Sequence, residues 1–185
     1  MENKRAAMEL SISTIVVIVL AVTMLILGLV LVRSIFNSGK GVIDLTDQQL
    51  REEVNKLFSE DKKMVVYPGT RLIDIKQGNV DGVGIGIKNL LTGESGSKEF
   101  SYVVQVSDPD LKKKCGVTEA VAESWITTGR KEDNIPIPAG DLSTQKVLFD
   151  IPIGSPLCTL RYRINVKVDG ESYATDFFDV TLKAK

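Results

Sequence analysis

Histidine is absent from this 185-residue chain, and cysteine occurs only twice. The first absence removes the commonest general base and the commonest metal ligand, so no Ser/His or Cys/His catalytic pair can form. Two cysteines exclude a cysteine-rich metal site and allow one disulfide at most. The sequence also has no Gly-x-Ser-x-Gly motif and no N-x-[ST] glycosylation signal. We therefore expect no enzyme, no metal site and no cofactor.

An excess of charge of one sign is also missing. The chain carries 23 Lys and Arg against 24 Asp and Glu, whereas nucleic-acid-binding domains usually show a strong basic excess. Gly82, Gly84 and Gly86 in DGVGIGIKN form neither a dinucleotide fingerprint nor a P-loop, and no helical pattern follows them. We expect no nucleic-acid partner and no nucleotide site.

Charge is absent altogether from one long run, the 23 residues Leu10 to Val32. At 1.5 Å per residue this run is about 34 Å long as a helix, enough to cross a hydrocarbon core of about 30 Å. A secretory signal peptide has a shorter apolar region of about 7–15 residues before a small-residue cleavage site. The following VRSIFNSGKG offers no such site, so the run is predicted to stay with the protein as a membrane-spanning helix.

An acidic residue and several small residues distinguish this helix from a plain anchor. Glu9 lies at its start with no basic residue three or four positions on. An unpaired carboxylate in a poor dielectric is costly, which favours a partner from elsewhere. The alternative is a Glu9 at headgroup level, in water beside the positive helix end. Five residues suited to close helix approach interrupt the apolar run: Ser11, Ser13, Thr14, Thr23 and Gly28.

The stretch KRAAMELSISTIVVIVL resembles the N-terminus of archaeal type IV pilins and their relatives, which carry a class III signal peptide. The resemblance covers residues 1–36 and implies that a prepilin peptidase removes the basic lead, residues 1–6, on the cytoplasmic side. Lys4 and Arg5 then form the basic pair, Ala6 precedes the cut and Ala7 is the new N-terminus. A register aligned on AAME cuts between Lys4 and Arg5 instead and makes Glu9 the fifth mature residue. An uncleaved chain is the third alternative.

In that family the apolar helices leave the membrane and pack together as the core of a filament. The resemblance therefore implies a core helix over 7–36, with Glu9 neutralising the N-terminal amine of a neighbouring subunit. It implies a homopolymer at the cell surface, inserted in the cytoplasmic membrane before assembly, with prepilin peptidase and pilus assembly machinery as partners. The alternative is a membrane-anchored, extracytoplasmic binding domain of the archaellum-stator type that does not polymerise.

A linker and an amphipathic helix are predicted over 37–61. Thr46 and Gln49 form a capping box that opens a helix from Asp47 to about Glu60. We expect its apolar stripe to dock the helix on its own head domain; the alternative is that it also extends the stalk toward neighbouring subunits. The stripe consists of Leu50, Val54, Leu57 and Phe58.

Alternation of period 2 dominates residues 62–185 and predicts strands. Asp169-Gly170 predicts a hairpin turn into a last strand whose Phe178, Val180 and Leu182 point inward. Seven or eight short strands favour an antiparallel β-sandwich of immunoglobulin-like type and an α+β chain overall. The candidate segments are MVVYP, RLIDIK, GVGIGIKNL, FSYVVQVSD, AESWITT, KVLFDIP, TLRYRINVKV and ESYATDFFDVTLK.

Three local features of this region carry further expectations. A Cys115–Cys158 disulfide would contribute roughly 4 kcal/mol and suit an extracytoplasmic domain; a reduced, buried pair is the open alternative. The loop LKKKC is expected to be solvated. Gly82, Gly84 and Gly86 share one strand face, where another backbone or a helix can approach closely. The expected occupant is the N-terminal helix or a neighbouring subunit.

Overall fold

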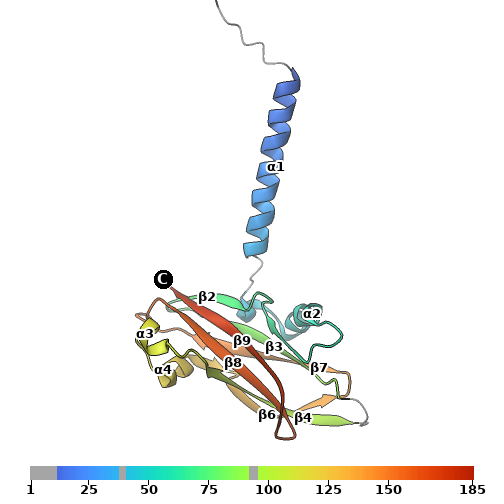
Figure 1. Ribbon diagram of the computed structural model, residues 1–185, viewed down its shortest axis with the longest axis vertical. Helices are drawn as coiled ribbons and strands as arrows, with labels where there is room; N and C mark the ends of the chain where they lie inside the picture. The colour runs from blue at the N-terminus through green and yellow to red at the C-terminus, as the bar shows by residue number, and fades with distance from the viewer. Residues whose placement is uncertain (1–11, 38–40, 92–95) are drawn as a thin grey trace, which may run out of the picture. The chain divides into compact units, whose positions relative to one another are not determined.

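A computed structural model describes residues 12–37, 41–91 and 96–185. The chain divides into two compact units, Met1–Gly39 and Lys40–Lys185. In the first unit α1 runs from Ile12 to Asn37 as one uninterrupted helix (Figure 1). The second unit, called the head below, is built mainly of β-strands. A long apolar helix and a β-rich head make the chain α+β, as its sequence predicts.

The head opens with a 3-10 turn, η1 (Val42–Asp44), and the helix α2 (Asp47–Leu57). The predicted capping box of α2 is confirmed. The Thr46 hydroxyl accepts the backbone N–H of Gln49 at 3.3 Å, and the Gln49 side-chain oxygen accepts the backbone N–H of Thr46 at 3.0 Å. This reciprocal pair satisfies N–H groups that a helix start leaves without intrahelical acceptors.

The apolar stripe of α2 docks the helix on its own head, as predicted. Leu50 and Val54 are almost fully buried, and they share a small core with Val65 of the strand β1 (Met64–Tyr67). The helix ends at Leu57, before the predicted Glu60, because the next residue adopts an extended backbone. The apolar stripe of α2 therefore covers the sheet that contains β1. The alternative, that α2 also contacts neighbouring subunits, stays a prediction.

Two sheets form the head. One has the order β1-β3-β7-β5 and the other β2-β9-β8-β4-β6. Two short helices, α3 (Leu111–Cys115) and α4 (Glu119–Ser124), lie between β4 and β5. The strands are β1 (Met64–Tyr67), β2 (Leu72–Lys76), β3 (Val80–Lys88), β4 (Ser97–Val106), β5 (Ile126–Thr128), β6 (Lys131–Pro138), β7 (Leu142–Asp150), β8 (Thr159–Val168) and β9 (Glu171–Lys183).

The inner faces of the two sheets pack on each other around a cluster of aromatic rings. Phe149 of β7 lies 5.0 Å from Tyr162 of β8 and 5.9 Å from Phe178 of β9, measured between ring centroids. These edge-to-face contacts join the two sheets and are of the geometry that aromatic pairs favour. The alternation predicted for β8 is confirmed, since its buried residues are Leu160, Tyr162, Ile164 and Val166.

The five-stranded sheet is mixed, which corrects the prediction of a purely antiparallel sandwich, whereas the four-stranded sheet is antiparallel throughout. β2 pairs with β9 in parallel, with Leu72 opposite Asp179 and Lys76 opposite Lys183. The remaining pairs are antiparallel, including the predicted hairpin between β8 and β9 at Asp169-Gly170. Both turn residues have positive φ, 51° and 86°, as the tight hairpin requires.

Two local predictions are wrong, and one strand was not predicted at all. The first three residues of AESWITT, Ala122 to Ser124, end the helix α4, and only Ile126–Thr128 forms a strand. The helix is capped by Thr118, whose hydroxyl accepts the Val121 N–H. LKKKC is the short helix α3 rather than a loop. The strand β6 was not expected, because KEDNIPIP carries two prolines and a run of charge; it lies at a sheet edge, where proline is tolerated.

Two buried tyrosines give a matched test of hydrogen bonding in this core. Tyr162 donates its hydroxyl to the Ala122 carbonyl at 2.9 Å, while the buried Tyr102 hydroxyl has no hydrogen-bond partner among the described residues. Burial raises the pKa of both phenols. We expect Tyr162→Phe to lower the free energy of unfolding by about 1–2 kcal/mol and Tyr102→Phe to leave it unchanged or raise it by up to about 1 kcal/mol.

Urea unfolding of the full chain in detergent, followed through the fluorescence of the one tryptophan, Trp125, measures both variants. Trp125 is buried, so its emission reports the loss of the core. Equal losses in the two variants would contradict the assignment of their hydroxyls.

Candidate functional site: the apolar helix and the surfaces of the head

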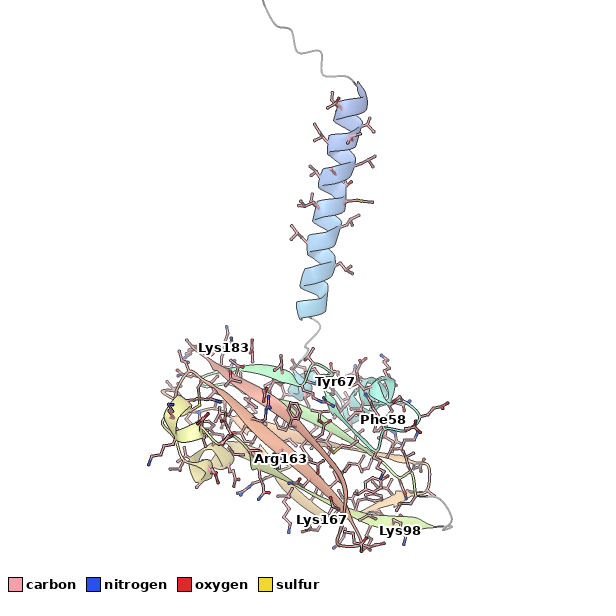
Figure 2. All side chains as sticks on the ribbon, viewed as in Figure 1. Phe58, Tyr67, Lys98, Arg163, Lys167 and Lys183 are labelled. Atoms are coloured by element: carbon pink, nitrogen blue, oxygen red, sulfur yellow. A yellow bond between two sulfur atoms is a disulfide. The ribbon has the colours of Figure 1, made fainter. Side chains whose placement is uncertain are left out.

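The apolar helix α1 presents an apolar surface on every side. Each described side chain from Thr14 to Leu31 is exposed, and Figure 2 shows side chains projecting around the whole helix. By length and composition this segment is able to cross a membrane. A helix that is apolar all round belongs in a protein core or in lipid. The surface of α1 is therefore the first candidate functional site of the chain.

The small residues predicted for close helix packing are partly described. The Thr23 hydroxyl donates to the Leu20 carbonyl of its own helix at 2.8 Å, so it needs no polar partner on another helix. A Cβ placed on Gly28 would meet no atom within 4 Å. Thr14 is exposed. Ser11 and the side chain of Ser13 lie outside the described residues. At Thr23 and Gly28 the side chains are short and offer no free hydrogen-bond donor, so another helix could approach α1 closely there.

The proposed processing and pairing residues lie outside the described part of the chain. They are Lys4, Arg5, Ala6, Ala7 and Glu9. Their roles in lead-peptide removal and inter-subunit pairing remain predictions.

The glycine-lined face of β3 is a site of close approach, but its occupant differs from the one expected. A Cβ on Gly84 would lie less than 3.0 Å from Leu50 of α2, and one on Gly86 would lie equally close to Val54. At Gly82 the obstacle is the Val147 carbonyl oxygen of β7. At Gly84 and Gly86 the face is therefore covered by α2 of the same head, not by the N-terminal helix or a neighbouring subunit.

Substitutions on this face test the docking of α2. We expect Gly84→Ala to lower the free energy of unfolding by about 1–2 kcal/mol, because the Leu50 side chain must move away from the new methyl group. Gly82→Ala is expected to lower it by about 3 kcal/mol, since backbone rather than a side chain must move. Urea unfolding of the full chain measures both values. The control is Gly84→Ala combined with Leu50→Ala, which should lose less than the sum of the single losses; strictly additive losses would contradict the contact.

The two cysteines are joined in a disulfide. Cys115 at the end of α3 and Cys158 just before β8 have their Cα atoms 5.6 Å apart. Of the two alternatives left open by the sequence, the structure has the bridged one. The bond fixes α3 to the start of β8.

The solvent face of β8 is basic and is the largest charged feature that the alternation predicts. It carries Arg161, Arg163 and Lys167, of which Figure 2 labels the last two. Arg161 binds Asp179 through two hydrogen bonds of 2.7 and 2.9 Å, which raise the pKa of its guanidinium, and it lies 4.4 Å from the ring centroid of Phe177. Arg161 is therefore held in place by its acidic and aromatic neighbours on β9.

The acidic turn at Asp108 also has partners within the head. Its carboxylate accepts the backbone N–H of Asp110 at 3.0 Å and an ammonium hydrogen of Lys114 at 3.2 Å. A depression beside it is lined by side chains of both signs. No group of three or more His, Cys, Asp or Glu side chains suited to a metal gathers among the described residues. This corner of the head is held together by charge pairs.

Sequence reasoning missed a set of exposed apolar side chains at one end of the head. They are Ile43 after the start of the head, Val80 at the start of β3, and Ile153 and Leu157 in the β7–β8 loop. Part of the signal was present in IPIGSPLC, where Ile153 and Leu157 each follow a proline outside any strand pattern. Period-2 reasoning gives such residues no role, because it assigns apolar positions only within strands.

The comparisons with known proteins name no family. No family model and no curated protein matches the chain. Similar solved structures include a Niemann-Pick type C2 protein from Japanese carpenter ant (14% identity, 66% of this chain and 90% of that one, TM-score 0.40) and a PapD-like domain of human CEP192 (9% identity, 66% and 85%, TM-score 0.35). The Pseudomonas fluorescens DNA glycosylase AlkC is also similar (11% identity, TM-score 0.33); 72% of this chain matches only 34% of that enzyme. Likeness at this level supports no statement about the activity of this chain.

Proposed function

We propose that this protein is a structural subunit of an archaeal type IV pilus-like surface filament. In this proposal α1 crosses the cytoplasmic membrane first and then packs with copies of itself as the filament core. The head is displayed outward for adhesion or surface contact. The observation that carries the proposal is the apolar surface of α1, exposed on every side from Thr14 to Leu31.

The size of that surface supports the need for an apolar environment. Fourteen large apolar side chains between Ile15 and Leu31 are 49–78% exposed. Removing the exposed half of each from water would contribute on the order of 1 kcal/mol per residue, and more than about 10 kcal/mol together. Lipid supplies that environment to a single subunit, and neighbouring helices supply it in a polymer.

The resemblance of residues 1–36 to pilins favours the polymer over a permanent anchor. It gives Glu9 a partner in the N-terminal amine of a neighbour, and it gives Thr23 and Gly28 a use in close helix packing. Further copies, a prepilin peptidase and assembly machinery are the partners that follow. For the head we propose an immunoglobulin-like sandwich, supported by two packed sheets of four and five strands.

Mass spectrometry of the N-terminus of the native protein tests this proposal. We expect a chain beginning at Ala7, or at Arg5 in the second register. A chain that keeps Lys4 and Arg5 would contradict the pilin assignment. It would favour the single-pass anchored binding domain of archaellum-stator type, which needs no processing.

A further inference from the structure

We propose that the end of the head at which its chain begins is a membrane-contact surface, which dips its apolar side chains into the lipid headgroup region while α1 spans the bilayer. The surface consists of Ile43, Val80, Ile153 and Leu157 and is called the apolar tip below. The inference rests on the membrane-inserted stage of the proposed function and extends it to the head.

The apolar tip contains most of the large apolar residues that are exposed in the described part of the head. Seven large apolar residues of the head are exposed, and four of them form the tip. Ile153 is 71% exposed and Leu157 61%. Single exposed apolar residues need no explanation, whereas a group of them marks a contact with a partner or a membrane.

Hydrogen bonds hold the three segments of the tip together. The Asp81 carboxylate, next to Val80, accepts the backbone N–H groups of Val42 and Ile43. The Gly78 N–H donates to the Ile151 carbonyl at 2.6 Å. The Gln77 side chain donates to the Ser155 carbonyl in the β7–β8 loop. The start of the head, the β2–β3 turn and the β7–β8 loop therefore form one connected end.

The length of the connecting chain determines what this end can reach. Four Cα–Cα steps join Asn37, the last residue of α1, to Gly41, and they span at most about 14 Å. Ile43 lies two residues further on. When α1 fills the bilayer, a connection of at most about 14 Å keeps the start of the head close enough to reach the headgroups. Interfacial apolar groups commonly insert about 5–10 Å at that depth.

Apolar insertion suits the tip better than attraction to charged lipid. Both signs of charge surround it, with Lys76 and Lys183 exposed on one strand pair and Asp44 and Asp150 exposed nearby. A surface of mixed charge gains little from anionic headgroups. The contact should therefore form on zwitterionic phosphatidylcholine and persist in 1 M salt, where charge attraction is screened.

Quenching of tryptophan by brominated phosphatidylcholine tests the inference with the full chain in vesicles. The native Trp125 is buried and provides a constant background. The variants Ile153→Trp and Leu157→Trp place a probe at the tip. Glu171→Trp is the matched control, exposed in the β8–β9 hairpin. Nine strand positions, about 30 Å, separate it from the Thr159–Thr181 end that adjoins the tip. Leu25→Trp reports insertion of α1 itself.

We expect bromolipid to lower the added emission of Ile153→Trp and Leu157→Trp at least about twofold and to leave that of Glu171→Trp unchanged. If Leu25→Trp is quenched and both tip probes are not, the tip does not contact lipid, while the membrane stage of the proposed function stands. If Leu25→Trp is not quenched, α1 does not span the bilayer, and both proposals fail. Equal quenching of the tip and hairpin probes would also overturn the inference, because contact would not be confined to the tip.

Discussion

Replacing Glu9 with glutamine is expected to abolish filaments while the protein still accumulates in the membrane. Glutamine keeps the size and hydrogen-bonding capacity of the side chain but removes the charge that would neutralise a neighbour's N-terminal amine. A buried charge that loses its partner costs about 3–5 kcal/mol. Because 1.4 kcal/mol is tenfold in an equilibrium constant, the concentration needed for polymerisation should rise at least about 100-fold.

Glu2→Gln is the matched control for this experiment, because Glu2 lies in the lead peptide that either cleavage register removes. We expect Glu2→Gln filaments to be as abundant as those of the wild type by electron microscopy of negatively stained cells. Membrane fractions probed for the head measure the amount of each variant. Unchanged filaments in Glu9→Gln would contradict the pairing of Glu9 with a neighbour's N-terminal amine.

Removing the disulfide is expected to give the largest loss of stability of any substitution considered. The double variant Cys115→Ser, Cys158→Ser should lower the free energy of unfolding of the head by about 4 kcal/mol, because the bridge closes a segment of 43 residues. A loss of this size is a large fraction of the 5–15 kcal/mol that stabilises most domains. Urea unfolding of the full chain in detergent, followed by Trp125 fluorescence, measures it.

Reduction of the wild-type protein provides the control for that variant. Dithiothreitol should lower the stability of the wild type to the level of the double variant and leave the double variant unchanged. If the free energy of unfolding of the double variant lay within about 1 kcal/mol of that of the oxidised wild type, the disulfide would contribute little to stability. The head would then need no oxidising compartment to be stable.

The parts of the fold that sequence predicts well are those determined by local chemistry. Alternation predicts β8 because successive side chains of a strand point to opposite faces, so the apolar ones can all face the core while the polar ones face water. The capping box at Thr46 and the hairpin at Asp169-Gly170 depend on contacts or backbone angles within a few residues. The docking of α2 is also predictable locally, because the apolar face of a short amphipathic helix is stable only when it is buried against the protein core.

The parts that sequence does not predict depend on contacts between distant segments. Nothing local to RLIDIK shows that β2 will pair in parallel with β9, more than 100 positions away in the chain. The glycines of β3 predict a close approach but not its occupant, because Gly84 accepts any helix of suitable shape. The helix α4 was missed because Trp125 and Ile126 resemble strand residues and outweigh the cap at Thr118.

The candidate functional surfaces likewise include one that the sequence predicts and one that it does not. The apolar run of α1 is evident from composition, since 23 uncharged residues in succession suit few environments. The apolar tip was not evident, because Ile43, Val80 and Ile153 are far apart in sequence and each is unremarkable alone. Only the folded head brings them to the end where its chain begins.

Helical reconstruction by electron cryomicroscopy of filaments sheared from cells that make this protein tests the central proposal most directly. We predict that the filaments contain this chain, that neighbouring copies cover residues 14–31 on all sides, and that the Glu9 carboxylate lies within about 4 Å of a neighbour's N-terminal amine. Surface filaments without this chain, together with a membrane fraction in which lipid alone surrounds α1, would contradict it.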